Sequence, residues 1–153
     1  MGRHRNSHPT PKMNNFCRSY AETALWSSHD NADESGGEPL DKNYGEHDIA
    51  LSSYKAMKRD CAKFWKANKR ALEMFAKHRR HQAHEGSAYA HAGHDFWLSA
   101  NGHGTGFWDR DAWEKEDQAS FDKIGKQLHE ASRKFASDMY VGDDGQIYVS
   151  PER

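Results

Sequence analysis

Histidine is the residue type whose clustering in this sequence most suggests chemistry. Six of the eleven histidines fall between residues 78 and 103, although no HExxH motif is present. His78, His81 and His84 are three apart, and on an ideal helix each step turns the side chain by about 60°. Neighbouring pairs can share a metal ion, but all three cannot converge on one tetrahedral zinc. We therefore favour a solvated basic helix end. The candidate metal ligands are His78, His81, His84, His91 and His94.

A second group of residues could supply acid–base chemistry. Residues 94–109 predict a strand, a glycine-rich turn and a second strand. Because a hairpin brings its two ends together, His94 and Asp109 are expected to lie close. They are the candidate catalytic pair, or with His91 the centre of a metal-dependent hydrolase. His103 falls at the far tip of the hairpin. A structural hydrogen bond at a sheet edge is the favoured alternative for His94 and Asp109.

Two further motifs predict turns rather than ligand sites. Gly102, Gly104 and Gly106 form a GxGxG run, but the residues after it predict a strand. A dinucleotide-binding loop requires a helix at that point. The pair Asp143-Asp144 suits a tight turn and lacks the twelve-residue calcium loop. No cofactor is expected.

Positive charge is concentrated in residues 49–85, which carry ten Lys and Arg against three Asp and Glu. Eight of these cations follow one side of a predicted helix and could track a phosphate backbone. The candidate binding residues are Lys55, Arg59, Lys63, Lys66, Arg70, Trp97, His103 and Trp108. A solvated helix face, or one matched to the acidic segment 27–48, is the alternative for the cations. Core packing is the alternative for the tryptophans.

The elements that position these residues follow from hydrophobic spacing. Residues 1–15 predict a flexible basic tail, and the apolar residues from Phe16 to Trp26 predict one short helix. After a loop at 27–48, the three- and four-residue steps of residues 49–80 predict one long helix with Asp48 as its N-cap.

A third helix, with its apolar stripe between Phe121 and Phe135, and a hairpin at 139–149 complete the expected chain. The predicted fold class is α+β, with two main helices packed on a small antiparallel sheet made of two hairpins. The flexible tail at 1–15 would precede one domain at 16–153.

Composition bounds the class of protein. Hydrophobic residues make up 35% of the 153 residues, and aromatic residues make up 12%, which predicts a core built from rings. Neither a membrane-spanning run nor a signal-peptide core is apparent, so a cytoplasmic protein with no membrane partner is expected. Cys17 and Cys61 form no CxxC pair, which favours a reducing compartment.

Several motifs occur together in a recognisable order. They are Ala24-Leu25-Trp26-Ser27-Ser28, Gly37-Glu38-Pro39-Leu40-Asp41, GHDFWL at 93–98, NGHG at 101–104, GFWDR at 106–110 and YVGDDG at 140–145. This order resembles a family of small uncharacterised proteins of bacteriophages and bacterial mobile elements. In that family Thr-Arg precedes NGHG, whereas this chain has Ser99-Ala100. The resemblance implies a phage-type context and no particular activity.

Three functions follow as hypotheses. The first is a non-catalytic accessory protein that binds a host or phage macromolecule in the host cytoplasm, such as a host defence or replication component. Its most expected partner is a protein. The second is a nucleic-acid-binding accessory protein that uses the basic helix face. The third is a metal-dependent hydrolase centred on His94 and Asp109.

Overall fold

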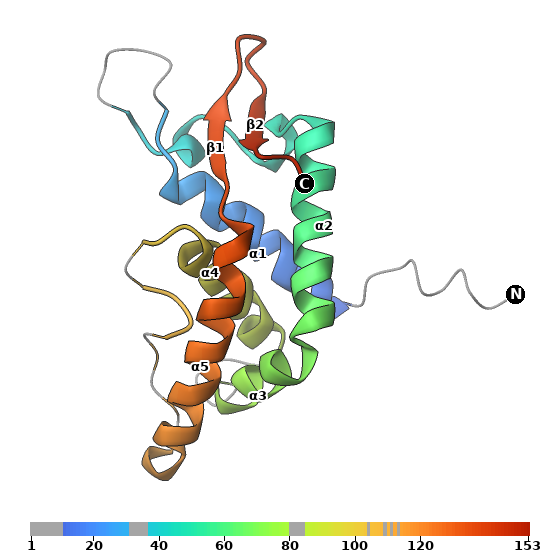
Figure 1. Ribbon diagram of the computed structural model, residues 1–153. Helices are drawn as coiled ribbons and strands as arrows, with labels where there is room; N and C mark the ends of the chain where they lie inside the picture. The colour runs from blue at the N-terminus through green and yellow to red at the C-terminus, as the bar shows by residue number, and fades with distance from the viewer. Residues whose placement is uncertain are drawn as a thin grey trace, which may run out of the picture.

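The computed structural model describes residues 11–30, 37–79, 85–103, 105–108, 110, 112 and 114–153 (Figure 1). Its helices are α1 (Pro11–Ser27), α2 (Leu51–Ala67), α3 (Lys69–Arg79), α4 (Glu85–Ala100) and α5 (Gln118–Ser132). Short 3-10 helices cover Leu40–Lys42, Glu46–Asp48, Lys115–Asp117 and Arg133–Phe135. Strands β1 (Asp138–Val141) and β2 (Ile147–Ser150) pair antiparallel. The predicted α+β class is confirmed.

Helix α1 begins earlier than the sequence predicts. It starts at Pro11, so residues 11–15 are helical and do not belong to a flexible tail. Proline suits the first turn of a helix, because its fixed φ is already helical and no amide hydrogen is needed there. Residues 1–10 lie outside the described part. Farther along, Phe16, Tyr20 and Leu25 are buried, as the predicted helix requires.

The predicted hairpin at 94–109 is wrong, because residues 94–100 form the last turns of α4. Every residue from Asp95 to Ala100 is buried. A helix enclosed on all sides has no polar stripe, so its sequence loses the 3.6-residue period that marks an amphipathic helix. Gly93 brings α4 against α1, since a Cβ there would overlap the carbonyl oxygen of Phe16.

Stacked aromatic rings fill the centre of the molecule, as the composition predicts. The Phe64 ring of α2 stacks on the Phe96 ring of α4 with centroids 4.1 Å apart. The Phe16 ring of α1 stacks on Phe96 at 5.7 Å. Phe107, which follows α4, and Phe135, which follows α5, also contact the Phe64 ring. One ring cluster therefore joins α1, α2, α4 and the segments that follow α4 and α5.

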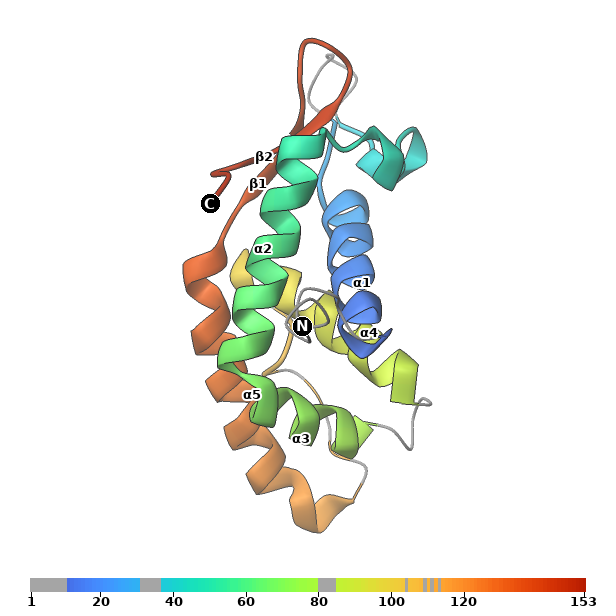
Figure 2. The same ribbon diagram turned by 90° about the vertical axis from the view of Figure 1, so that its right-hand side faces the viewer.

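The long helix predicted at 49–80 is two helices. α2 ends at Ala67 and α3 begins at Lys69, with α3 turned away from the α2 axis (Figures 1 and 2). At the break, Asn68 donates its side-chain amide to the carbonyl of Phe64 at 3.0 Å. The N-cap prediction is also wrong. Ala50 occupies that position, and Asp48 instead accepts the backbone N–H of Gly45 at 2.8 Å.

The C-terminal hairpin forms as predicted. Met139 pairs with Val149 and Val141 with Ile147, while Gly145 takes a φ of 82° in the turn. The backbone N–H of Ala50 donates to the carbonyl of Ile147 at 2.7 Å, which attaches the hairpin to the start of α2. This is the two-stranded sheet of the described chain. No helix in those residues has the length and apolar character needed to cross a membrane.

Candidate functional site

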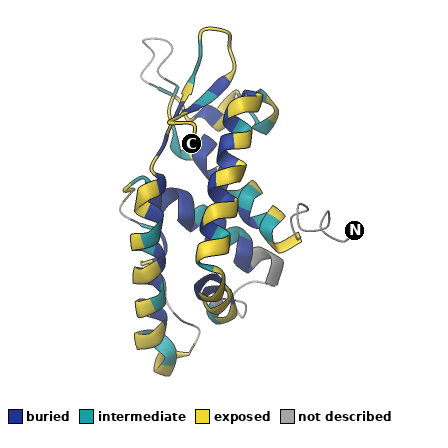
Figure 3. Ribbon diagram, turned by 45° about the vertical axis from the view of Figure 1, so that its right-hand side comes forward, coloured by how far each residue is buried: buried dark blue, intermediate teal, exposed yellow. Residues whose placement is uncertain are grey.

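A row of cations covers the outward side of α2. We call it the α2 basic surface, and it consists of Lys55, Lys58, Arg59, Lys63 and Lys66, all of them exposed. The opposite side of α2 carries Met57, Cys61 and Phe64, which are buried. Within each of these two sides, the residues recur at steps of three and four, as expected for an amphipathic helix. Figure 3 shows the outward side of α2 as exposed along its length.

The α2 basic surface has a single sign of charge. Asp60 is the acidic residue of α2, and it is buried rather than outward. One of its oxygens accepts a hydrogen bond from the Arg153 guanidinium at 2.8 Å. Burial raises the pKa of Asp60, although Arg153 and, more weakly, Lys63 and Arg59 oppose that effect. The outward cations of α2 thus outnumber one buried carboxylate, which is hydrogen bonded to Arg153 rather than to any of them.

The acidic segment 27–48 does not neutralise this surface through any residue that the structure describes. Glu38 pairs with Lys42 at 2.7 Å, and Asp48 lies 3.4 Å from His47. Among the described residues, no carboxylate forms an ion pair with the α2 basic surface. Arg59 is held by a hydrogen bond from its Nε to the carbonyl of Arg153 at 3.0 Å. Residues 31–36 of the segment lie outside the description.

The structure places four of the five predicted cations on one helix and separates the fifth. Lys55, Arg59, Lys63 and Lys66 lie on α2, whereas Arg70 lies on α3. Arg70 is exposed, but the break at Asn68 turns its helix in another direction. A continuous straight stripe from Lys55 to Arg70 is therefore wrong, and the row on α2 is the coherent part.

His94 has a different carboxylate partner from the predicted one. Its Nδ1 lies 3.0 Å from Oδ1 of Asp95, the next residue on α4. Arg110 donates to both oxygens of Asp95, at 2.6 and 3.0 Å. The proposed partner Asp109 lies outside the described residues. The His94 ring also stacks on Trp26, with centroids 5.7 Å apart.

The environment of Asp95 indicates a structural role. Asp95 is 1% exposed. Burial alone would raise the pKa of its carboxyl, but the hydrogen bonds from His94 and Arg110 outweigh burial and hold that pKa below its ordinary value. A carboxylate held charged by a bidentate arginine is a poor proton acceptor. It instead ties the segment after α4 to the helix.

The remaining candidate metal ligands that the structure describes do not form a site. His78 lies 3.7 Å from a carboxylate oxygen of Asp117 and packs its ring on Phe121. His91 is partly buried on α4. His81 and His84 lie outside the description. Within the described residues, no group of three histidine, cysteine or acidic side chains is arranged to hold a metal ion.

The aromatic binding candidates separate into core and surface. Trp97 is 2% exposed, and its indole N–H donates to Ser27 at 2.8 Å, so Trp97 is a core residue and not part of a contact surface. Trp108 is 47% exposed and packs edge-on against His129. His103 is exposed in the same segment. That segment lies on the far side of the molecule from the outward side of α2 (Figures 1 and 2).

Sequence reasoning missed two contacts between distant segments. Arg110 pairs with Asp95, and Cys17 of α1 meets Cys61 of α2. Both cysteines occupy predicted helices, which is the one signal that could have suggested their meeting. Comparison with known protein families, curated proteins and solved structures finds no match to this chain.

Proposed function

We propose that the chain is a non-catalytic accessory protein that binds the backbone of duplex nucleic acid through the α2 basic surface. The observation that carries this proposal is the exposure of five cations of one sign on one helix, unpaired with any carboxylate that the structure describes. A folded protein gains little stability from such a row, because like charges three and four residues apart repel. A polyanion would remove that repulsion.

The chemistry of the surface supports backbone binding over sequence reading. Lysine and arginine neutralise phosphates, whereas base recognition in the major groove also draws on Asn, Gln and acidic side chains. The other exposed residues of α2 are small or apolar: Leu51, Ser52, Ala62 and Ala67. The most exposed aromatic residues of the described chain, Trp26, Trp108 and Tyr140, are each less than half exposed and lie on other elements. Stacking on single-stranded bases is therefore not supported on α2.

A protein partner, the first hypothesis from the sequence, has less support. Protein interfaces are built around a buried cluster of apolar or aromatic residues. The exposed large apolar side chains of the described chain lie on five different segments. They are Trp26, Leu51, Met74, Trp108 and Tyr140. These apolar side chains are scattered over five segments, whereas the five cations of the α2 basic surface lie together on one helix.

Salt-dependent binding tests the proposal. Fluorescence anisotropy with a labelled duplex of random sequence should show affinity falling as salt rises. Five phosphate contacts predict a loss of about 500-fold between 50 and 200 mM salt. An unrelated duplex should bind equally well. Absence of binding at low salt would exclude the function.

A matched pair of variants separates the surface from overall charge. Lys55→Glu/Lys63→Glu changes α2, and Lys123→Glu/Lys126→Glu makes the same change of net charge on α5, where both lysines are exposed. The α2 variant should lose most of its affinity and reduce the salt slope by about 2. The α5 variant should bind nearly as the wild type does. Equal losses would assign binding to net charge alone.

A further inference from the structure

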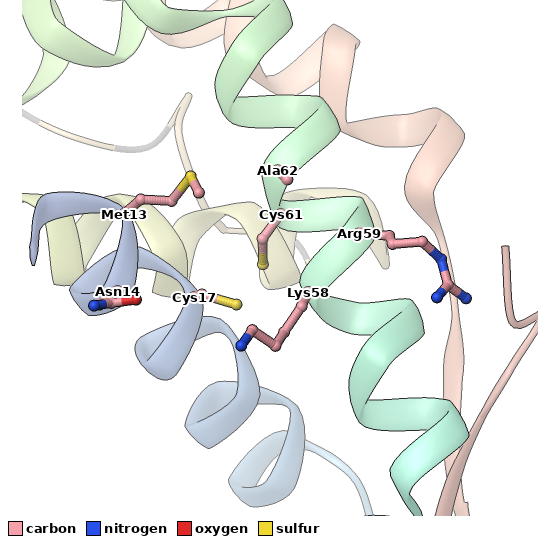
Figure 4. Close-up of a pocket in the computed structure, with 7 residues that line it drawn as sticks. All are labelled: Met13, Asn14, Cys17, Lys58, Arg59, Cys61 and Ala62. Carbon is pink, nitrogen blue, oxygen red and sulfur yellow. The ribbon is translucent and has the colours of Figure 1, made fainter. Parts of the chain in front are cut away.

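Two thiols from different helices meet at the edge of a cavity. Cys17 of α1 and Cys61 of α2 are both free, and their side chains point toward one another (Figure 4). The Cys61 thiol hydrogen bonds to the Cys17 sulfur. The cavity beside them measures about 240 Å³ and is also lined by Met13, Asn14, Lys58 and Arg59. The two sulfurs are thus close enough to interact and lie next to an open space.

The two thiols are not equivalent. Cys61 is 1% exposed, whereas Cys17 is only partly buried. The hydrogen bond from Cys61 lowers the pKa of Cys17, and the Lys58 ammonium also lowers it, while burial and Glu46 oppose these effects. Burial raises the pKa of Cys61 well above its ordinary value, and the hydrogen bond to Cys17 acts in the same direction. Because Cys17 is the less buried of the two thiols and lines the cavity, a reagent in the cavity reaches Cys17 first, with Cys61 behind it.

We propose that Cys17 and Cys61 form a redox-active dithiol that is oxidised by a small anionic disulfide entering the cavity beside Lys58. The Lys58 side chain extends toward Cys17 and supplies the positive charge of this site (Figure 4). That charge attracts the carboxylates of an anionic disulfide and repels a cationic one. Arg59 also lines the cavity, but its guanidinium points away from the two sulfurs and donates to Arg153.

The reaction balances in two exchange steps. The Cys17 thiolate attacks one sulfur of the small disulfide, which forms a mixed disulfide on Cys17 and releases one thiolate. Cys61 then attacks the Cys17 sulfur, which forms the Cys17–Cys61 disulfide and releases the second thiol with the proton that Cys61 loses. The protein is oxidised by two electrons, and the small disulfide is reduced to two thiols. The product links α1 covalently to α2.

The proposal does not rest on nucleic-acid binding, because the two thiols lie outside the α2 basic surface, although Lys58 belongs to both sites. A soft metal ion is a poorer occupant. The two thiols lack a third histidine, cysteine or carboxylate ligand among the residues described. The steps also assign distinct roles to the two cysteines, which makes them separable by substitution.

Mass spectrometry of the reduced full chain, incubated with glutathione disulfide, tests the two steps. Wild-type protein should lose the mass of two hydrogen atoms and yield a cross-linked peptide pair that contains residues 17 and 61. Cys61→Ser should stop at the glutathione adduct on Cys17, and Cys17→Ser should remain unmodified. Circular dichroism checks that both variants are folded. A wild-type product without the cross-link, or an adduct on Cys61, would overturn the proposal.

The pH dependence of alkylation tests the hydrogen bond between the thiols. Cys17 should react with iodoacetamide at a lower pH than a free cysteine does. Cys61→Ser retains a hydroxyl donor and should keep most of this shift, whereas Cys61→Ala has no donor and should lose much of it. Equal pH profiles in both variants would contradict the assigned interaction.

The charge of the oxidant is tested with two reagents. Glutathione disulfide is anionic and cystamine is cationic, and each rate is divided by the rate with a free cysteine. At low salt the wild type should prefer glutathione disulfide by about tenfold. Lys58→Gln should reduce that preference, and Lys123→Gln on α5 should leave it unchanged. Equal rates for the two reagents would overturn the assigned oxidant. So would a Cys17–Cys61 cross-link that forms with hydrogen peroxide but with neither disulfide.

Discussion

Helices α2 and α4 are of similar length but meet their surroundings in opposite ways. α2 buries one side and exposes five cations on the other. α4 is enclosed from Asp95 to Ala100, and its buried charge is neutralised by a partner from the following segment. The buried charge of Asp95 therefore holds α4 to the following segment, as the buried charge of Asp60 holds α2 to Arg153, whereas the outward cations of α2 are exposed.

Removing the arginine that pairs with α4 should give the largest loss of stability. Arg110→Ala leaves Asp95 buried with only His94 as a partner. Breaking a buried ion pair typically costs about 3–5 kcal/mol, and we expect the lower end because Arg110 is 23% exposed. Urea unfolding curves, monitored by tryptophan fluorescence, measure this loss in the free energy of unfolding.

The control for that measurement is Arg70→Ala, which removes an exposed arginine from α3. It should change the free energy of unfolding by less than about 0.5 kcal/mol. If both arginines cost the same, the distinction between structural and available charge would fail.

The packing of α4 on α1 predicts the next largest effect. Gly93→Ala should destabilise the protein by about 1–3 kcal/mol, because the added methyl group overlaps the backbone of Phe16. Helix propensity alone would predict a gain, so the sign of the change is diagnostic. Ala67→Leu adds bulk at an exposed position of α2 and should be nearly neutral in the same unfolding assay. A stabilising Gly93→Ala would contradict the close contact.

Acid should weaken the ion pair on α4 and leave the contribution of Lys55 on α2 unchanged. The pKa of Asp95 lies below its ordinary value in the folded protein, so its stabilising contribution is complete above the unfolded value of about 3.9. That contribution is lost as the pH falls through the lower folded value. The stability difference between the wild type and Asp95→Asn should therefore shrink in strong acid. The difference between the wild type and Lys55→Gln should not change there, and unfolding curves at several pH values measure both.

The smallest predicted effect is a change in the free energy of unfolding that has opposite signs for an exposed lysine of α2 and an exposed lysine of α5. Lys55 has Lys58 three residues after it and Arg59 four residues after it, whereas Lys126 of α5 lies between Asp122 and Glu130 at four-residue steps. Lys55→Gln should stabilise the protein by a few tenths of a kcal/mol at low salt, and Lys126→Gln should destabilise it by a similar amount. Thermal unfolding at low and high salt measures the difference, which salt should abolish. The same sign for both would contradict repulsion on α2.

The sequence predicted α2 well because one side of that helix faces water. The cations Lys55, Arg59, Lys63 and Lys66 repeat at helical steps opposite apolar residues, so periodicity alone locates them. The end of α2 was missed because Asn68 continues the apolar spacing while its side chain caps the carbonyl of Phe64. The spacing of apolar residues does not reveal that a side-chain hydrogen bond to the backbone ends the helix at this point.

The sequence could not predict α4 for the complementary reason. With Phe96, Trp97 and Leu98 all buried, apolar residues follow one another without a helical period and resemble a buried strand. The same limit applies to pairs of residues. Asp95–Arg110 and Cys17–Cys61 depend on how helices and loops pack, and neither partner carries a local signal of the other.

The break at Asn68 also limits the length of the α2 basic surface. From Lys55 to Lys66 the helix rises by about 16 Å, and phosphates along one strand of duplex DNA are spaced about 3.4 Å apart along its axis. A duplex footprint of about five base pairs therefore matches the five cations of α2. Oligonucleotides shorter than this should bind progressively more weakly, and lengthening them beyond it should add little for a single copy of the protein.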